Sequence, residues 1–193
     1  MGPNLLPEIL SVLLRFRLYK CAILGDVSQA ILQITLGPTD RVLIRFLWYR
    51  FVPNSPGSYD TTDEVITYRF TRPHFGLTCN PFILSATIRT LATVHHEMYP
   101  TASALMGRIT YIDDLETSAT HDKDIVTIFF EVTSLMNTIH LPMYKWATTR
   151  PTCKTFGGHK VNRYGRRSKS SEWIGTPSLT RFTLTTRTLQ AIA

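Results

Sequence analysis

The chain of 193 residues is 44% hydrophobic, which is enough to bury one compact core, and it carries a formal net charge of +7. It has no apolar run long enough to cross a bilayer, and its start at Met1 lacks the basic residues of a secretory signal, so we expect no membrane association. The three cysteines (Cys21, Cys79 and Cys153) are odd in number and far apart, which argues against a disulfide framework or a zinc site.

Hydrophobic periodicity predicts alternating helices and strands in the first half of the chain. In order, these are a helix over residues 5–17, a strand over 19–27, a short helical turn over 28–34, and strands over 42–51 and 65–71. Gly37 and Pro38 end the helical turn. Because the last two strands flank residues 53–63, a segment rich in turn-forming residues, we expect them to form a β-hairpin.

The second half of the chain continues the same alternation. Its predicted elements are a helix over residues 81–96, strands over 105–112 and 115–118, a helix over 121–137 and a strand over 141–146. Pro81 suits the first turn of its helix, and Asn80 is the predicted N-cap. Asp113 and Asp114 are expected at the turn between two strands. The pattern predicts an α+β fold, with an antiparallel sheet and helices packed on one face.

The positive charge is concentrated at the C-terminus. Residues 1–153 hold 13 basic and 13 acidic residues, whereas residues 154–193 hold eight basic residues and one acidic residue. A basic segment suits a polyanion such as nucleic acid, and a disordered, solvated tail is the alternative interpretation. We therefore predict a globular domain over residues 1–153 and a basic, disordered tail over residues 154–193.

Three carboxylates lie next to predicted strands. Asp26 is near the end of one strand, and Asp113 and Asp114 directly follow another. Adjacent carboxylates repel each other, so a fold holds them together only where something neutralises them. Two divalent cations would do so, and cations held by carboxylates stabilise the attacking and leaving oxygens in phosphoryl transfer. Alternatively, Asp113 and Asp114 form a polar turn, and Asp26 is a strand-end acid or a helix cap.

A series of sequence blocks runs in order along residues 2–150. The blocks are Gly2–Pro7 with Val12–Arg17, Gly25–Val27 with Leu32–Ile34, Asp40–Arg41 with Arg45–Trp48, Tyr68–Phe70 with Phe75–Phe82, Tyr111–Asp114, and Lys145–Trp146. Together they resemble the palm of a reverse transcriptase of Bel/Pao-like retrotransposons. The block Tyr111–Asp114 alone would be a weak signal, because four-residue strings recur by chance.

The resemblance implies an RNA-directed DNA polymerase that performs two-metal nucleotidyl transfer on an RNA or DNA template-primer with a dNTP. By resemblance, Asp26, Asp113 and Asp114 bind two Mg²⁺ ions, with Mn²⁺ as a substitute, and all three are catalytic. Lys145 resembles the palm lysine that stabilises charge or donates a proton near the triphosphate. A cytoplasmic location and other parts of a retroelement polyprotein as partners are also family implications.

The resemblance also implies contacts with substrate. The backbone near Val27 and Ser28 is expected beside the triphosphate, and Phe75 and Gly76 under the templating base and the nucleotide. Ile31 stands where the family has an aromatic ring that favours dNTPs over ribonucleotides. The predicted substrate-binding residues are Val27, Ser28, Ile31, Phe75, Gly76 and Tyr111.

By comparison with the family, residues 1–153 are expected to form a palm with incomplete fingers and no thumb. Residues 154–193 match no part of that family. Since positioning of primer and triphosphate supplies much of the rate, we expect weak or no polymerase activity from the isolated chain. The alternatives are a non-catalytic nucleic-acid-binding remnant of a retroelement, acting through residues 154–193, and a marginally stable product without function.

Overall fold

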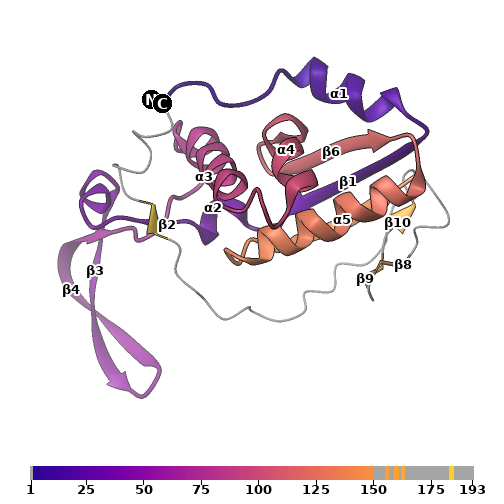
Figure 1. The fold of residues 1–193 in the computed structure, drawn as a ribbon. Coiled ribbons are helices and arrows are strands. Elements are labelled where there is room, and N and C mark those ends of the chain that lie inside the picture. Colours follow the sequence, from indigo (N-terminus) through magenta and orange to yellow (C-terminus); the bar gives the residue numbers. More distant parts are fainter. Residues whose placement is uncertain (1, 150–154, 157–158, 161, 164–182, 185–193) are drawn as a thin grey trace.

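The structure is a computed structural model that describes residues 2–149, 155–156, 159–160, 162–163 and 183–184 (Figure 1). Most of the segment predicted to be a disordered basic tail therefore lies outside the described residues. Its described residues form short strands.

Helices and strands follow one another along the chain. The helices are α1 (Ile9–Leu18), α2 (Ala30–Gln33), α3 (Asn80–Val94), α4 (Pro100–Ile109) and α5 (Asp122–Asn137), with a 3₁₀-helix η1 (Asp40–Leu43). The strands are β1 (Cys21–Val27), β2 (Thr35–Leu36), β3 (Arg45–Ser55), β4 (Ser58–Arg69), β5 (Thr110–Tyr111), β6 (Asp114–Ala119), β7 (Met143–Thr148), β8 (Thr155–Phe156), β9 (His159–Lys160), β10 (Asn162–Arg163) and β11 (Thr183–Leu184). This confirms the predicted mixture of helices and antiparallel strands. No helix in the described ranges is long and apolar enough to cross a membrane.

β1 lies at the centre of a five-stranded sheet whose strand order is β10-β7-β1-β6-β5. It runs antiparallel to β6 on one side and to β7 on the other, while the short β10 is parallel to β7. The register places Cys21 opposite Ala119 and Asp26 opposite Asp114. Because side chains alternate along a strand, Cys21 and Ile23 face one side of the sheet and Asp26 faces the other.

The main core fills the space between one face of this sheet and helices α3, α4 and α5. Ile23 of β1, Leu115 of β6, Met106 of α4 and Phe129 of α5 are almost completely buried there. Phe129 also meets the indole of Trp146 on β7 edge to face, with 4.9 Å between ring centroids. Each such side chain contributes about 1.5–3 kcal/mol of hydrophobic stabilisation. The core therefore fixes how β1, β6 and β7 lie against the helices, and Figure 1 shows α5 running along β1.

Helix α1 packs against β6 on the opposite face of the sheet, which we call the open face. The expectation that helices cover one face therefore holds only for α3, α4 and α5. Ser118 of β6 donates from its hydroxyl to the Arg15 carbonyl and accepts a hydrogen bond from the Tyr19 amide at 3.2 Å. Val12 and Phe16 of α1 are buried outside the main core. The helix covers the end of β6 and leaves its beginning exposed.

The strand predicted over residues 105–112 is wrong for most of its length, because α4 continues to Ile109. Pro100 occupies the first turn of α4, where its missing amide costs nothing. Ala102, Met106 and Ile109 recur at helical spacing and are all buried. A short apolar run fits either a helix or a strand, and here packing of α4 against α3 and α5 decides for the helix.

The predicted hairpin is present as β3 and β4, but its strands are longer and its turn is shorter than expected. The two strands extend through residues 53–63, which were predicted as turn, and they close at Pro56 and Gly57. Gly57 has a φ of +80°, a conformation that glycine adopts at no steric cost. Pro53 is tolerated inside β3 because each strand of a two-stranded hairpin has a free edge, where no amide donor is needed.

A row of aromatic rings runs along this hairpin, although nearly all of its residues are exposed. Successive ring centroids lie 4.6 Å apart for Phe70 and Phe46, 5.6 Å for Phe46 and Tyr68, 5.9 Å for Tyr68 and Phe51, and 6.4 Å for Phe51 and Tyr59. Such pairs contribute about 0.5–1.5 kcal/mol each. The hairpin is therefore held by contacts between its own side chains.

Three predicted element ends also differ from the structure. α1 begins at Ile9 rather than at residue 5, because Pro7 disfavours a helical conformation in the residue before it. β3 begins at Arg45, since the preceding residues form η1. Asn80 is not a cap but the first residue of α3, and its side-chain amide donates to the His74 carbonyl at 2.9 Å.

A β-bulge in β7 separates two neighbouring side chains. The register of β1 on β7 shifts between Leu24 and Asp26, so that Lys145 and Trp146 both stand opposite Gly25. Lys145 is the extra residue and has a φ of +49°. Bulges re-aim side chains, and this one directs Trp146 into the core and Lys145 toward the open face.

Gly25 is required by the packing of Trp146 across β1. A Cβ atom at Gly25 would lie 2.8 Å from Cε3 of Trp146 and 3.0 Å from Cε of Met143. Both distances are too short for carbon atoms in contact, so the bulge depends on the absence of a side chain here.

We predict that Gly25→Ala lowers the free energy of unfolding by about 1–3 kcal/mol, because the added methyl group overpacks the core at Trp146. Gly107→Ala is the matched control. A Cβ there meets only Nε of Arg89, at 3.9 Å, and alanine is favoured over glycine inside a helix by roughly 0.5–1 kcal/mol. Urea unfolding of both variants checks this, and a Gly25→Ala variant as stable as the unmodified chain would contradict it.

Candidate active site

The register of β1 and β6 brings the predicted carboxylates to one end of the sheet. Asp26 and Asp114 stand directly opposite each other, so their side chains leave the open face with Cβ atoms about 4.5–5.5 Å apart. The carbonyl of Asp113 accepts a hydrogen bond from the Val27 amide at 2.8 Å. Asp113 lies in the turn as predicted, whereas Asp114 is already the first residue of β6 and not part of the turn.

The turn that carries Asp113 is strained. It connects Tyr111 to Asp114, which pair across β5 and β6, through only Ile112 and Asp113. Ile112 has a φ of +58°, a region that costs a β-branched residue about 1–3 kcal/mol. The hydrogen bond from Val27 and the β5–β6 pairing hold the turn in this conformation. The position of Asp113 beside β1 is therefore imposed by the surrounding sheet.

The carboxylates repel one another electrostatically. Partial burial raises the pKa of Asp114, and the charges of Asp113 and Asp26 raise it further, while Lys145 acts in the opposite direction. These influences show that the three carboxylates and the ammonium group share one electrostatic environment. A cation placed among them would relieve this repulsion.

Lys145 places a positive charge next to the carboxylate of Asp26. Its Nζ lies 2.5 Å from Oδ2 of Asp26, and the hydrogen bond and the charge of Asp26 raise the pKa of Lys145. The side chain of Asp26 is 21% exposed, whereas that of Lys145 is 79% exposed. Because Lys145 lies in solvent, this ion pair contributes little to stability and can exchange for another cation.

Glu116 is a fourth carboxylate on the open face, and we did not predict it from sequence. It lies two residues after Asp114 on β6 and opposite Leu24 on β1. Burial and the charge of Asp114 raise its pKa, and its Oε2 atom is buried without a hydrogen-bond partner in the described part of the chain. The alternation of side chains along the predicted strand was the signal that could have identified it.

The donor atoms suit Mg²⁺, which prefers oxygen ligands, and the register places Asp26 and Asp114 on adjacent strands. Within residues 2–149 and the short described segments after them, however, no three His, Cys, Asp or Glu side chains converge on a point that could hold a metal ion. Lys145 occupies one oxygen of Asp26 instead. Chemistry and backbone position thus fit a metal site, and side-chain rotation with release of Lys145 would be needed to form it.

The backbone amides of Val27 and Ser28, two of the predicted substrate-binding residues, are already hydrogen-bonded within the chain. The Val27 amide is bonded to the Asp113 carbonyl, and the Ser28 amide is bonded to the Pro142 carbonyl at 3.2 Å. Neither amide is therefore available to a triphosphate. Both amides complete the protein's own hydrogen bonding, and the expected position of a triphosphate beside Val27 and Ser28 stays a prediction.

Of the other predicted substrate residues, Tyr111 is placed next to a carboxylate by the sheet register, since it pairs with Asp114. Ile31 is 8% exposed and belongs to the main core, so it lines no open nucleotide site. Phe75 is 71% exposed, and Gly76, with a φ of +93°, has open space around it. Ile31, Phe75 and Gly76 make no hydrogen bond or ring contact with Asp26, Asp113 or Asp114 in the described residues.

We predict that Asp114→Asn stabilises the chain at pH 7. A raised pKa means that the folded chain holds the proton of Asp114 more tightly than the unfolded chain does, so stability falls as pH rises through that pKa. Asparagine removes the charge. The gain should stay below about 1 kcal/mol, because Asp114 is exposed and its interactions are screened.

Urea unfolding in EDTA at pH 7 and pH 3 measures this effect. The stabilisation should be present at pH 7 and absent at pH 3, where the carboxyl group is neutral in both states. Asp60→Asn, on the exposed hairpin, is the control and should change stability little at either pH. An Asp114→Asn variant that is no more stable at pH 7 than the unmodified chain would refute the prediction.

Comparison with known proteins adds no relative from which a function could be transferred: no family model matches the chain, and no curated protein matches it. A function for these residues therefore has to be argued from their geometry and chemistry.

Proposed function

We propose that this chain is the palm domain of an RNA-directed DNA polymerase, which joins a dNTP to the 3′-hydroxyl of a primer on an RNA or DNA template. The observation that supports this most is the position of Asp26 opposite Asp114 on adjacent antiparallel strands, with Asp113 in the adjoining turn. Two separate chain segments thus place carboxylates on the one face of the sheet that α3, α4 and α5 do not cover. A nucleic acid could approach them from that side.

In this proposal Asp26, Asp113 and Asp114 hold two Mg²⁺ ions, with Mn²⁺ as a substitute. When bound, such ions activate the attacking hydroxyl and stabilise the leaving pyrophosphate. The electrostatics favour this role, since the charges of Asp113 and Asp26 already raise the pKa of Asp114. Asp113 is fixed from the backbone by its hydrogen bond with Val27, so its position does not depend on a bound ion.

Lys145 would act as a mobile positive charge. The bulge in β7 directs it to Asp26, and this carboxylate raises the pKa of Lys145 and so favours the charged form further. With cations held by the carboxylates, the ammonium group of Lys145 would be free to stabilise charge on the phosphates or to donate a proton to the leaving group. Lys145 thus competes with metal before the reaction and assists the substrate during it.

A second candidate function is nucleic-acid binding without catalysis. Two observations favour it: Lys145 is paired with Asp26, and no three carboxylates converge on one point in the described residues. Binding of this kind would not depend on Asp113. Metal binding and primer extension therefore separate the two functions.

We predict that the isolated chain extends an annealed primer only weakly in Mg²⁺ or Mn²⁺, and that Asp113→Asn and Asp26→Asn each reduce this rate about 100-fold or more, because charge stabilisation in the transition state is lost. The measurement is single-nucleotide extension resolved on a gel. Asp124→Asn, in the first turn of α5, is the control and should retain the rate. Primer binding without extension, unchanged in all three variants, would favour the second candidate.

We also predict that Lys145→Met tightens Mn²⁺ binding and slows primer extension. Removal of the ammonium group frees Oδ2 of Asp26, so the cation meets no competitor. Electron paramagnetic resonance titration measures free Mn²⁺ without any turnover, and Lys123→Met, on α5, is the control. If Lys145→Met weakened Mn²⁺ binding or left it unchanged, competition between Lys145 and the metal would be refuted.

A further inference from the structure

A groove of about 990 Å³ runs between α3 and α4, on the helical side of the sheet. Hydrogen bonds from Arg89 to Leu5 and from Arg15 to Arg108 place it beside the N-terminal segment and α1. Its lining residues come from α3, from α4 and from the connection between them. They are Arg89, Ala92, Thr93, His96, Pro100, Ser103, Ala104, Gly107 and Arg108.

The charge of the groove is positive. Arg89 and Arg108 line it together with His96, and no acidic residue lines it. Neither arginine forms an ion pair, since the ion pairs in the described part of the chain are Arg50 with Glu64 and Lys145 with Asp26. A partly buried guanidinium group without a carboxylate favours binding of an anion.

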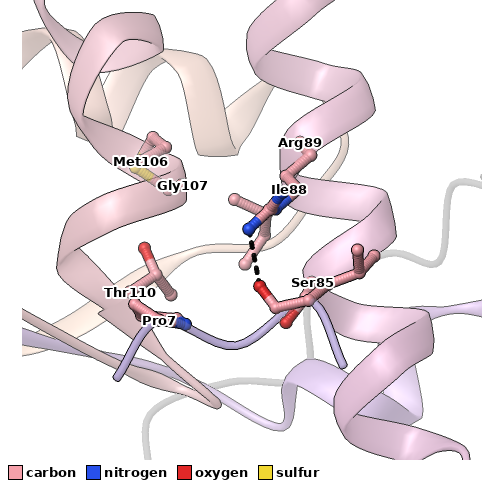
Figure 2. A pocket seen from close by; sticks show the side chains of 8 residues that line it. Pro7, Ser85, Ile88, Arg89, Met106, Gly107 and Thr110 are labelled. Atoms are coloured by element: carbon pink, nitrogen blue, oxygen red, sulfur yellow. Dashed lines mark hydrogen bonds between the residues drawn. The ribbon is translucent and has the colours of Figure 1, made fainter. Parts of the chain in front are cut away.

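The side chain of Arg89 is held by a hydrogen bond, whereas the side chain of Arg108 is not, within the part of the chain that the structure describes. Arg89 donates from Nη2 to the Leu5 carbonyl at 2.7 Å, and Figure 2 shows it reaching from α3 toward that N-terminal segment, beside Gly107 of α4. Arg15 of α1 donates to the Arg108 carbonyl at 3.4 Å. The Arg108 side chain itself is exposed and makes no hydrogen bond among the described residues.

Unpartnered hydroxyl groups are the second feature that points to a ligand. The Oγ atom of Ser103 is buried and lacks a hydrogen-bond partner in the described part of the molecule. Thr110, which is 7% exposed, has an unpartnered Oγ1 in the small cavity of Figure 2, and Arg89 and Gly107 line both that cavity and the groove. Buried hydroxyls without partners are costly, and a polar ligand or the water that accompanies it would satisfy them.

Two acidic residues close in sequence or structure to the groove-forming segments, Glu131 and Glu97, do not line the groove. Glu131 of α5 accepts a hydrogen bond from the Ala102 amide at 2.9 Å and so neutralises the N-terminus of α4. Glu97 follows His96 in the sequence but does not line the groove. The two arginines therefore set the charge that a ligand in the groove would meet.

We propose that the groove between α3 and α4 binds the phosphodiester backbone of a nucleic-acid strand. Ala92 and Ala104 have small side chains and Gly107 has none, so they leave room in the groove, and Arg89 on α3 and Arg108 on α4 line it from both helices. Among the described residues, the lining contains no Phe, Tyr or Trp, and the imidazole of His96 is the one ring among its residues, so contacts with bases are few. Recognition would thus be through phosphates and independent of sequence.

This second surface does not depend on the proposed polymerase function, because none of Asp26, Asp113, Asp114 and Glu116 lines it and it needs no metal. It would hold a strand on the helical side of the same domain whose open face carries the carboxylates. A polymeric ligand fits an open groove between two helices better than a small molecule, which would be enclosed on most sides.

The test is fluorescence anisotropy of a labelled single-stranded oligonucleotide with the full chain in EDTA, measured as a function of salt. We expect Arg108→Gln to weaken binding about three- to tenfold, the usual value of one hydrogen-bonded contact. The slope of log K against log salt should fall by about 0.7, the value for one phosphate on a single strand. Arg17→Gln, an exposed arginine on α1, removes the same charge outside the groove and should leave both quantities nearly unchanged.

Ala104→Lys adds a positive charge to the groove, whereas Arg108→Gln removes one. Ala104 is exposed and lines the groove, so a lysine there should tighten binding and steepen the salt dependence without disturbing the core. Polyadenylate and polycytidylate should give the same changes in affinity. The proposal is overturned if Arg108→Gln and Arg17→Gln behave alike, if Ala104→Lys has no effect, or if only a free nucleotide responds to these substitutions.

Discussion

The position of β1 between two antiparallel partners is the constraint on which the site depends. One face of this strand is buried against α5, and the other carries Asp26. Because side chains alternate with a period of two, a slip of one residue against β6 would turn Asp26 into the core. Burial of Ile23 and Leu115 on the opposite face prevents that slip. Hydrophobic packing on one side of the sheet thus sets the arrangement of charge on the other.

In β7, too, packing in the core positions a charged side chain on the open face. Trp146 is fixed in the core by its contact with Phe129, and this requires a glycine across the strand at position 25. The bulge that accommodates the indole gives Lys145 a conformation that a regular strand would not. The charge on the open face is therefore positioned by an apolar residue next to it in the sequence. An alteration of the core at Trp146 would also change the electrostatics around Asp26.

Local sequence patterns predict the elements that have a long run of hydrophobic periodicity or that end at turn-forming residues. They predict β1, α5 and the β3–β4 hairpin, and they identify Asp26 and Asp113 as carboxylates next to strands. The helix α4 was mistaken for a strand, because its apolar residues are few and packing against α3 and α5 decides its conformation. The bulge and the role of Gly25 depend on a contact between residues far apart in the chain, and no local pattern contains it. The metal site and the reaction remain predictions.

The exposed hairpin has a further consequence for the behaviour of the whole molecule. Its rings contact mainly one another, and neither strand pairs with the central sheet. A two-stranded ribbon of this kind is marginally stable by itself, so β3 and β4 can open while β1, β6 and β7 stay folded. The domain therefore joins a cooperative unit to a locally fluctuating one. Its unpaired strand edges offer backbone donors and acceptors to which a strand from another chain could be added.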